Sequence, residues 1–363
     1  HAVAALFDDS VLIGGDFTSF NSYPINRIGK LFTDGSVDKS FKVGSGADDT
    51  VTTIKTKNDG KILIGGRFKS YNGKVSYGVA QLNPDGSYDS GFNVGTGFDQ
   101  TVRDIYVQDD NYVLLAGEFT SYNNTNAVHL IRLDQDGNID DKLKIKRAPN
   151  APVNAVVSDQ DGSIIAVGEF TKVGEYQRNY IVRYKADGEV DPNFESVEGA
   201  NGIIHDVAIQ SDGKIIIAGE FTRINFVERN RIARLNSDGT VDRSFNPGEG
   251  FDSTVYTIVI DKDKNRKIYR ESGNIGGAPI SNPDYLKIYA GGIFHQFDEV
   301  RRYGLTRLNS DGTLDTTFMD NSFNQFAGIP TSGEQDPRNF IKDISLTQDK
   351  DLYISGSFTK VGG

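Results

Sequence analysis

The chain has 363 residues, of which 37% are hydrophobic and 25% are charged, a composition typical of a folded globular protein. Its net charge of −11 argues against a nucleic-acid partner, because duplex binding depends on Lys and Arg side chains at the phosphates. No run of about 18 apolar residues occurs, so no membrane insertion is expected. The absence of cysteine excludes disulfides and thiolate zinc sites, and it leaves the compartment open.

Two independent markers show that the chain is built from repeats. A Gly-x-Phe motif ends at Phe17, Phe68, Phe119, Phe170, Phe221, Phe294 and Phe358. Its first four intervals are 51 residues each, and its last two are 73 and 64. An Asp-Gly motif follows the same steps at Gly35, Gly86, Gly137, Gly188, Gly239 and Gly312. Because the two spacings agree, one repeated unit covers essentially the whole chain.

Each repeat is predicted to contain four short strands, called a to d. In the second repeat they fall at about Val51–Lys57, Lys61–Phe68, Tyr77–Leu82 and Tyr88–Val94. Asp-Gly turns join a to b and c to d, as expected for tight hairpins in which glycine adopts a positive φ. No segment has a sustained apolar period of about 3.6 residues, so almost no helix is expected.

Four-stranded antiparallel units of about 51 residues predict an all-β fold, a seven-bladed β-propeller. A solenoid of stacked sheets is the alternative. Residues 1–363 are interpreted as one propeller domain. The seventh repeat reaches only its a–b hairpin, so the last blade is expected to be incomplete in this chain. The chain is therefore predicted to be an excerpt of a longer polypeptide that supplies the missing strands.

The motifs "RLNSDGTVDRSF" (Arg234–Phe245) and "RLNSDGTLDTTF" (Arg307–Phe318) resemble the delta-60 repeat family of bacterial and phage-associated propellers. The third repeat departs from the pattern with Leu143 in place of the final Phe, and the sixth and seventh carry insertions. The resemblance implies a seven-bladed propeller within a large secreted, cell-surface or virion protein. It implies no activity.

The repeated residues are interpreted as structural. Strand b residues such as Ile62 and Ile215 are expected to pack between blades, and the Gly two before each Phe to let blades approach. The third residue after each Phe is aromatic in four repeats, but Val173 and Ile224 share the position, which favours a core role over base or sugar stacking. The second Asp of each D-G-x-x-D motif is expected to brace the hairpin backbone. Calcium binding, with "DQDGNIDD" (Asp134–Asp141) as the best candidate, is the alternative.

An ion pair across strands b and c is also predicted. Where the residue before the repeated Phe is Glu, as at Glu118, Glu169 and Glu220, the next strand carries Arg; where it is Arg67, the next strand carries Gln81. This covariation predicts that the acid pairs with the base on strand c. A ring of acids that binds cations is the competing interpretation.

Candidate binding residues lie in the loops between strands b and c, which share one rim with the connections from d to the next a. Function commonly sits on loops held by a rigid scaffold, and these loops combine Tyr, Asn and Arg. The candidates are Tyr23, Tyr77, Asn124, Asn126, Tyr176, Arg178, Arg229, Arg231, Arg301 and Arg302. Solvated loops without a partner are the alternative.

A second candidate site lies at the propeller axis, where the a strands meet. Aligned charged residues predict a funnel lined by Arg103, Asp104, His205, Asp206, Lys342 and Asp343. His205 and Asp206 are not expected to form a dyad, because neighbouring side chains on a strand face opposite ways. Only His1 and His205 share a blade position, which leaves a His-based metal site open for that pair alone.

Two insertions, Lys262–Tyr285 and Asn321–Asn339, are expected to lie on opposite rims and to contact another domain or subunit, or to be tolerated surface insertions. No nucleophile elbow, phosphate-binding Gly loop, HExxH or paired-Cys metal motif occurs. The leading hypothesis is a non-enzymatic structural and binding module of an extracellular, cell-surface or virion protein without a cofactor. A glycan-binding module and an axial lyase or hydrolase that uses His205 are the alternatives.

Overall fold

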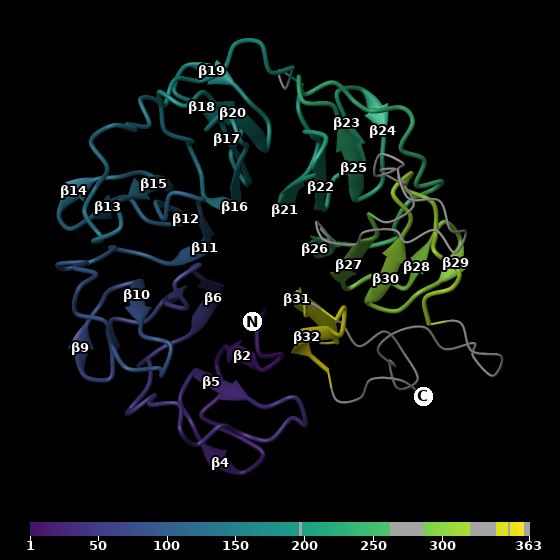
Figure 1. The fold of residues 1–363 in the computed structure, drawn as a ribbon. Coiled ribbons are helices and arrows are strands. Elements are labelled where there is room, and N and C mark those ends of the chain that lie inside the picture. Colours follow the sequence, from purple (N-terminus) through teal and green to yellow (C-terminus); the bar gives the residue numbers. More distant parts are fainter. Residues whose placement is uncertain (196–197, 262–285, 320–338, 348, 359–363) are drawn as a thin grey trace, which may run out of the picture.

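The computed structural model of the chain describes residues 1–195, 198–261, 286–319, 339–347 and 349–358. Every regular element in these ranges is a β-strand, which confirms the expected lack of helix there. The strands form repeated antiparallel sheets around a central axis (Figure 1), so the fold is propeller-like. The described residues hold no helix long and apolar enough to cross a membrane.

Each sheet places its first strand at the axis, and later strands lie progressively further out (Figure 1). The first strands are β1 (Ala2–Ala5), β6 (Val51–Thr56), β11 (Val102–Val107), β16 (Val153–Ser158), β21 (Ile204–Ile209), β26 (Val255–Ile260) and β31 (Phe340–Leu346). The second strands are β2 (Val11–Gly14), β7 (Ile62–Gly66), β12 (Val113–Gly117), β17 (Ile164–Gly168), β22 (Ile215–Gly219), β27 (Ile288–Gly292) and β32 (Leu352–Ser357). The third strands are β5 (Ile28–Leu31), β10 (Val79–Leu82), β15 (Leu130–Leu133), β20 (Ile181–Tyr184), β25 (Ile232–Leu235) and β30 (Leu305–Leu308).

The first strands contact one another in sequence around the axis, and β31 lies between β26 and β1. Six of the sheets have three strands, whereas β31 and β32 form a two-stranded sheet in the described part of the chain. The second strand β32 is only half-buried, while its counterpart β27 is fully buried. The ring therefore contains six complete repeats and one thinner unit.

The predicted fourth strand is wrong in its extent. In each three-stranded sheet it is reduced to one bridging residue, such as Tyr88 opposite Leu82. The reason is local: Asp89 accepts a hydrogen bond from the backbone N–H of Gly91 at 2.9 Å, which turns the chain away from the sheet. The same turn follows the corresponding aspartates Asp38, Asp140, Asp191, Asp242 and Asp315. The prediction that these aspartates brace the backbone is confirmed.

The predicted ion pair across strands b and c is also wrong. Arg132 pairs with Asp140, the second Asp of the D-G-x-x-D motif, at 2.5 Å, and not with Glu118. Register is the reason, because Arg132 lies opposite Leu114, four residues before Glu118. Arg183, Arg234 and Arg307 likewise pair with Asp191, Asp242 and Asp315.

The hydrophobic core lies between neighbouring sheets. Ile62 and Ile64 of β7 are buried in one cluster with Leu12 of β2, which confirms the packing role predicted for strand b. Gly66, however, does not serve the approach of neighbouring blades. A Cβ atom there would lie 2.1 Å from the carbonyl oxygen of Thr50 in its own sheet.

Between the second and third strands, each complete repeat projects a small hairpin. These hairpins are β3–β4 (Ser19–Phe20, Tyr23–Pro24), β8–β9 (Ser70–Tyr71, Lys74–Val75), β13–β14 (Ser121–Tyr122, Thr125–Asn126), β18–β19 (Lys172–Val173, Tyr176–Gln177), β23–β24 (Arg223–Ile224, Val227–Glu228) and β28–β29 (Gln296–Phe297, Val300–Arg301). Tyr71, Tyr122, Val173, Ile224 and Phe297 in these hairpins are buried, which confirms their core role. The Tyr122 hydroxyl donates to the Gly137 carbonyl at 2.6 Å.

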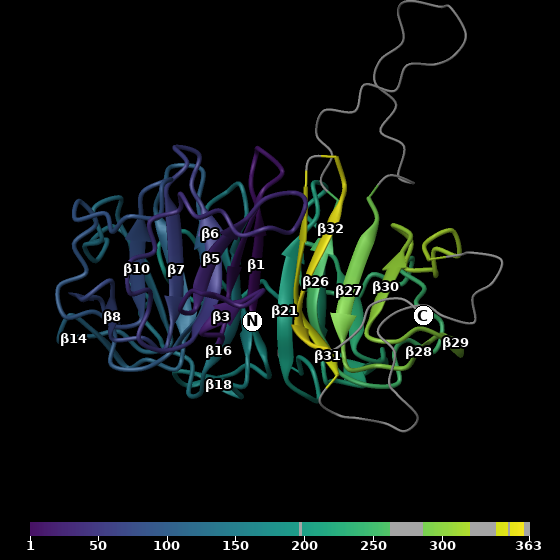
Figure 2. The ribbon, with the colours of Figure 1, turned by 90° about the horizontal axis from the view of Figure 1, so that it is seen from below.

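The two rims of the ring differ in construction. The hairpins β8–β9, β13–β14, β18–β19 and β28–β29 lie on one side, which we call the hairpin rim (Figure 2). The tight turns between first and second strands, such as residues 57–61 between β6 and β7, lie on the other side, which we call the turn rim (Figure 2). The two insertions, Lys262–Tyr285 and Asn321–Asn339, lie outside the described residues except for Asn339.

Candidate functional site

A β-bulge in the first strands shapes the axis. In β11 the pairing register shifts between Val102 and Asp104, which leaves Arg103 as the extra residue. Corresponding shifts occur beside His205 and Lys342. A bulge breaks strict alternation, so adjacent side chains can reach the same neighbour: both Arg103 and Asp104 contact β16. The neighbours His205 and Asp206 nevertheless have different partners, Glu220 and the backbone N–H of Ile258, in agreement with the prediction that they form no dyad.

The bulge residues form a layer of polar contacts near the start of the first strands. Arg103 donates to Glu118 at 2.7 Å and to Glu169 at 2.5 Å, so one guanidinium links two sheets. The Nε2 atom of His205 lies 3.0 Å from Glu220, and burial lowers the pKa of the His205 imidazole. Glu220 directly follows β22, the second strand of the sheet that also contains His205. Asp206 has a different partner.

A second layer contains three carboxylates from one aligned position. Asp104 accepts the backbone N–H of Val156 at 3.0 Å, Asp206 that of Ile258 at 2.7 Å, and Asp343 that of Val3 at 2.9 Å. Each bond joins the first strand of one sheet to that of the next. These aspartates therefore help to hold the ring together as well as line its axis.

Lys55 of β6 reaches the same layer. Its Nζ atom lies 3.7 Å from Asp104 Oδ1, and 46% of its side-chain surface faces open space inside the ring. Although burial lowers it, the negative charges of Asp104, Asp343 and Asp206 raise the pKa of Lys55. Burial raises the pKa of Asp206 to about 7 and also raises that of Asp343. Lys342 also interacts electrostatically with Asp343 and Asp206, and the N-terminal ammonium with Asp343, yet burial outweighs these positive charges at Asp206 and Asp343.

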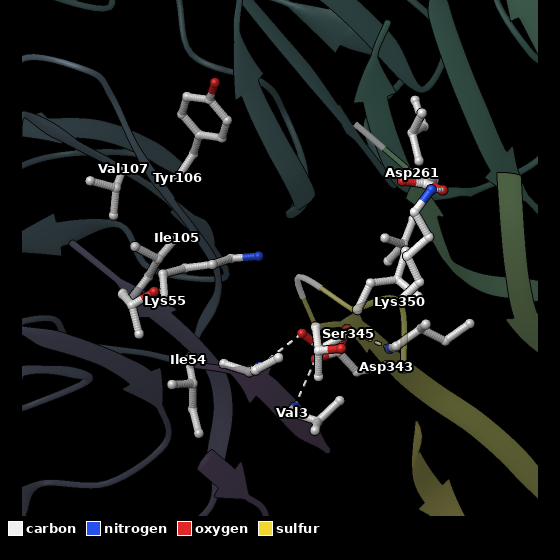
Figure 3. Close-up of a pocket in the computed structure, with 18 residues that line it drawn as sticks. Val3, Ile54, Lys55, Ile105, Tyr106, Val107, Asp261, Asp343, Ser345 and Lys350 are labelled. Carbon is white, nitrogen blue, oxygen red and sulfur yellow. Dashed lines mark hydrogen bonds and ion pairs between the residues drawn. The ribbon is translucent and has the colours of Figure 1, made fainter. Parts of the chain in front are cut away.

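Above this layer the axis widens into a cavity of about 810 Å³ toward the turn rim (Figure 3). Its apolar lining includes Val107, Val259 and Leu346. Lys55 points into the open space from β6, and Asp343 lies at its edge (Figure 3). At the mouth, Lys350 donates to Asp261 at 2.6 Å. The volume lies in the range of small-molecule sites, about 300–1,000 Å³.

The six axial candidates are therefore split between two layers. Arg103, His205 and Lys342 lie in the first, and Asp104, Asp206 and Asp343 in the second. The Lys342 ammonium lies 4.8 Å from the ring centre of Tyr256. In the described part of the chain, no group of three or more His, Asp or Glu side chains is placed to hold a metal ion.

Sequence reasoning missed Lys55, although a signal existed. The aligned position is uncharged in the other repeats, where it holds Ala4, Tyr106, Val157, Ala208, Val259 and Ser345. When one repeat has a charged residue at a position that is uncharged in the others, packing between the repeats does not explain that residue. The acids Glu118, Glu169 and Glu220 were assigned to the wrong partners for the reason of register given above.

The hairpin rim carries the other ten candidates, of which several are exposed. Asn124 and Asn126 are exposed, and Tyr77 and Tyr176 expose 40% and 39% of their surface. The Tyr176 ring has the guanidinium groups of Arg147 and Arg178 at 5.5 and 5.6 Å from its centre. Arg301 is exposed and lies 4.6 Å from the Tyr303 ring centre. Tyr23 is half-buried, with the Lys39 ammonium 5.2 Å from its ring centre.

The remaining arginine candidates point into the hairpins. Arg178 is only 6% exposed, and Arg229 and Arg302 are half-buried. Each donates to the carbonyl of the residue before it, so these guanidinium groups brace the hairpin. Arg231 is half-buried, donates to the Phe251 carbonyl and has a φ of +65°. The side chains of these four arginines stabilise the local backbone. The candidates that remain available to contact a partner are the other six.

The chain is similar to several solved propeller-type structures at low identity. One is a protein of unknown function from Bacteroides caccae, with 15% identity, 85% of this chain and 94% of that chain covered, and a TM-score of 0.44. Another is the C-terminal WD40 domain of Sif2, with 11% identity, 99% and 93% covered, and a TM-score of 0.49. A third is YCF48 bound to D1 peptide, with 10% identity, 98% and 90% covered, and a TM-score of 0.46.

No curated protein sequence matches the chain. The family model described as "Domain of unknown function (DUF5122) beta-propeller" matches six segments, residues 8–41, 57–92, 108–141, 160–194, 210–245 and 287–318. These segments together span more than half of the chain, and each covers the second and third strands of one three-stranded sheet. The chain therefore belongs to the DUF5122 β-propeller family.

Proposed function

We propose that this chain is a non-enzymatic structural and binding module of a larger extracellular, cell-surface or virion protein, and that its hairpin rim contacts a protein partner or receptor. The observation that carries the proposal is the pairing of arginine with exposed aromatic rings on that rim. The exposed Tyr176 between Arg147 and Arg178 is the main example, and the half-buried Tyr303 beside Arg301 is a second pair. Tyr and Arg are enriched in protein interfaces, because they bury a large area and also form hydrogen bonds.

The scaffold supports this proposal. Five of the six hairpins are anchored by a buried residue such as Tyr71 or Tyr122, so the rim side chains there start from fixed positions. Rigid presentation lowers the entropy lost when a partner binds. His205 is bonded to Glu220 and lines neither the axial cavity nor the second cavity beside Tyr106, which speaks for a binding role over axial catalysis.

Site-specific photocrosslinking tests the proposal. A benzophenone side chain is placed at Tyr176 in the longest natural polypeptide that contains the chain, within the cells or virions that make it. The matched control places the same group at Phe7, an exposed aromatic residue of the turn rim. We expect a discrete adduct from Tyr176 and none from Phe7. Equal adducts from both positions, or none from Tyr176, would contradict the proposal.

A glycan is the second candidate ligand of the hairpin rim. Exposed Tyr77 and Tyr176 offer flat faces for sugar stacking, and exposed Asn124 and Asn126 offer amide hydrogen bonds. A glycan array separates the two candidates: binding that is lost in Tyr176→Ala and retained in Phe7→Ala assigns a sugar ligand. An array without signal leaves the protein partner as the proposal.

We also propose that β31 and β32 are the inner half of a seventh blade. Support comes from their place between β26 and β1 and from Phe358, which continues the Gly-x-Phe series. An experimental structure in which β32 packs as part of the sixth sheet, with six blades closing the ring, would overturn this assignment.

A further inference from the structure

A second cavity opens on the turn rim, away from the hairpins. It has a volume of about 640 Å³ and is lined by the turns that join β11 to β12, β16 to β17 and β21 to β22. The Tyr106 ring lines this cavity and also the axial cavity, at whose edge it stands (Figure 3). The volume lies within the range of small-molecule sites, about 300–1,000 Å³. The cavity is therefore large enough for an organic ligand.

A buried amide in this lining has an unpaired donor. Gln210 is only 4% exposed and lines the cavity. Its Oε1 atom accepts a hydrogen bond from Arg234 at 3.4 Å, and because a guanidinium can only donate, this contact fixes the orientation of the amide. The Nε2 atom then has no acceptor in the described part of the chain. Because an unsatisfied buried donor is costly, a ligand that brings an acceptor to this point gains affinity.

The third repeat shows how the chain satisfies the same amide elsewhere. Gln108 occupies the equivalent position and accepts a hydrogen bond from Arg132 at 3.3 Å. Its Nε2 atom donates to the hydroxyl of Ser158 in the next sheet at 2.9 Å. In the sheet after Gln210, the residue equivalent to Ser158 is Ile260, which has no side-chain acceptor. One apolar residue in place of a serine thus accounts for the unpaired amide.

The rest of the lining offers an aromatic face and carboxylate acceptors. Tyr106 is half-buried, and its hydroxyl donates to the Ser158 carbonyl at 3.2 Å, which holds the ring in place. Asp110 and Asp159 each accept one backbone N–H with one oxygen, so the second oxygen of each can accept from a ligand. The cavity therefore combines a flat apolar face, a buried donor and several acceptors.

We propose that this cavity binds a neutral mono- or disaccharide. One face of the sugar stacks on the Tyr106 ring, a hydroxyl oxygen accepts from Gln210 Nε2, and a hydroxyl hydrogen is donated to Asp159. A sugar hydroxyl both donates and accepts, so one ligand satisfies the amide and the carboxylates together. The site lies on the turn rim and does not depend on the partner proposed for the hairpin rim.

Other ligand classes fit less well. An anion would approach the carboxylates of Asp109, Asp110 and Asp159. An ammonium suits these carboxylates, but it brings a further donor to the Gln210 amide, which needs an acceptor. In the part of the chain that the structure describes, no group of three or more carboxylate or imidazole side chains is placed to hold a metal ion. A neutral polyhydroxy ligand uses the donor and the acceptors at once.

Isothermal titration calorimetry of the longest natural polypeptide that contains the chain tests the proposal, with cellobiose, maltose, lactose and diacetylchitobiose as probes. Gln210→Glu keeps an oxygen for Arg234 but loses the N–H donor, so we expect binding to weaken on the order of tenfold. Tyr106→Ala removes the stacking face and should weaken binding by a similar factor. Tyr106→Phe should bind as the parent does, because the hydroxyl is already used by the Ser158 carbonyl.

Gln177→Glu is the matched control, because it makes the same chemical change at an exposed residue of the hairpin rim. We expect it to bind the probes as the parent polypeptide does. Tyr176→Ala serves as a second control, since it removes the exposed ring of the hairpin rim and leaves the cavity intact. Circular dichroism melting shows that each variant is folded before titration, and Gln210→Glu still tests the proposal if Tyr106→Ala does not fold.

Several outcomes would overturn the proposal. They are absence of binding of every probe by the parent, and equal affinity of the parent and folded Gln210→Glu. Binding that is lost in Tyr176→Ala and kept in Gln210→Glu would place the sugar on the hairpin rim instead. Tighter binding of putrescine than of any disaccharide, strengthened by Gln210→Glu, would assign the cavity to an amine. Crosslinking at Tyr176 does not report on this cavity, so the hairpin-rim proposal is tested separately.

Discussion

Asp242 and Asp206 belong to the same repeat, and each accepts a backbone N–H, yet their pKa values are shifted in opposite directions. Asp242 lies at the outer turn, where Arg234 and Lys214 reach one of its oxygens at 2.8 and 2.9 Å. Despite burial, the hydrogen bonds of Ser244, Lys214 and Arg234 hold its pKa well below the usual range. At the axis, burial raises the pKa of Asp206 to about 7.

The difference lies in how close the cations are to each carboxylate. At the outer turn two cations lie within 2.9 Å of Asp242, whereas at the axis the ion pair between Lys55 and Asp104 is 3.7 Å long. A carboxylate that is paired with a cation in five of the six three-stranded repeats is explained by stability. An undercompensated one that occurs in alternate repeats costs stability, and such groups concentrate at functional sites.

Removal of the outer carboxylate should have the largest effect. Asp242→Ala leaves the Arg234 guanidinium buried without its anionic partner, since both side chains are only 8% exposed. Breaking a buried ion pair from one side costs about 3 kcal/mol or more. We expect the free energy of unfolding, measured by urea titration, to fall by about 3 kcal/mol.

Asp38→Ala is the matched control. Asp38 is the equivalent aspartate of the first repeat and caps Ser40, while the nearby Lys30 pairs with Asp8 instead. Only the turn contact is lost, so we expect a decrease of about 1 kcal/mol. Equal losses in the two variants would show that the cations at Asp242 contribute no net stability.

The sequence was sufficient to predict the sheets and the Asp turns, because the 51-residue spacing and the Asp-Gly hairpins are local signals. It was not sufficient to assign the partner of Arg132. The residue at the position of Glu118 varies with the base, whereas the position of Asp140 is Asp in all six repeats. Only the register, with Arg132 opposite Leu114, shows which acid is near. Covariation in the sequence therefore does not identify the acid that pairs with the base, whereas a distance in the structure does.

The sequence predicted that charged side chains line the axis, but it did not predict how these side chains are arranged. The bulge at Arg103 depends on close approach of β12 to the start of β11, since a Cβ atom on Gly117 would lie 2.2 Å from the Thr101 carbonyl oxygen. A glycine alone does not reveal what approaches it. Lys55 was overlooked because the repeat alignment directs attention to shared residues, and its position is charged in one repeat only.

The pH dependence of stability should separate the two aspartates. The folded state holds the proton of Asp206 more tightly than the unfolded chain does, because its pKa is raised to about 7. The resulting stabilisation is fully present below about pH 4 and is lost as pH rises through 7. Asp206→Asn lacks this loss. Relative to the parent chain, we expect the variant to gain on the order of 1 kcal/mol between pH 5 and pH 8.

Urea titrations of both proteins at pH 5, 6, 7 and 8 provide the measurement. The charged groups that act on Asp206 are Asp104, Lys55 and Lys342, and they remain in both proteins. Asp242 has the opposite sign: its pKa is lowered, so its stabilisation is present above about pH 4 and lost at more acidic pH. A difference between parent and Asp206→Asn that does not change with pH would show that Asp206 is fully compensated at the axis.

The smallest expected effect concerns the buried hairpin anchors. Tyr122→Phe removes the hydroxyl that donates to the Gly137 carbonyl at 2.6 Å and leaves that buried acceptor without its side-chain donor. The expected loss is about 1 kcal/mol. Tyr71→Phe removes the equivalent bond to Gly86 and should cost a similar amount. Tyr176→Phe, at an exposed ring of the hairpin rim, should leave the urea midpoint unchanged. If Tyr176→Phe destabilised the chain as much as Tyr122→Phe, Tyr176 would be a residue that stabilises the fold. The main argument for a partner at the hairpin rim would then be lost.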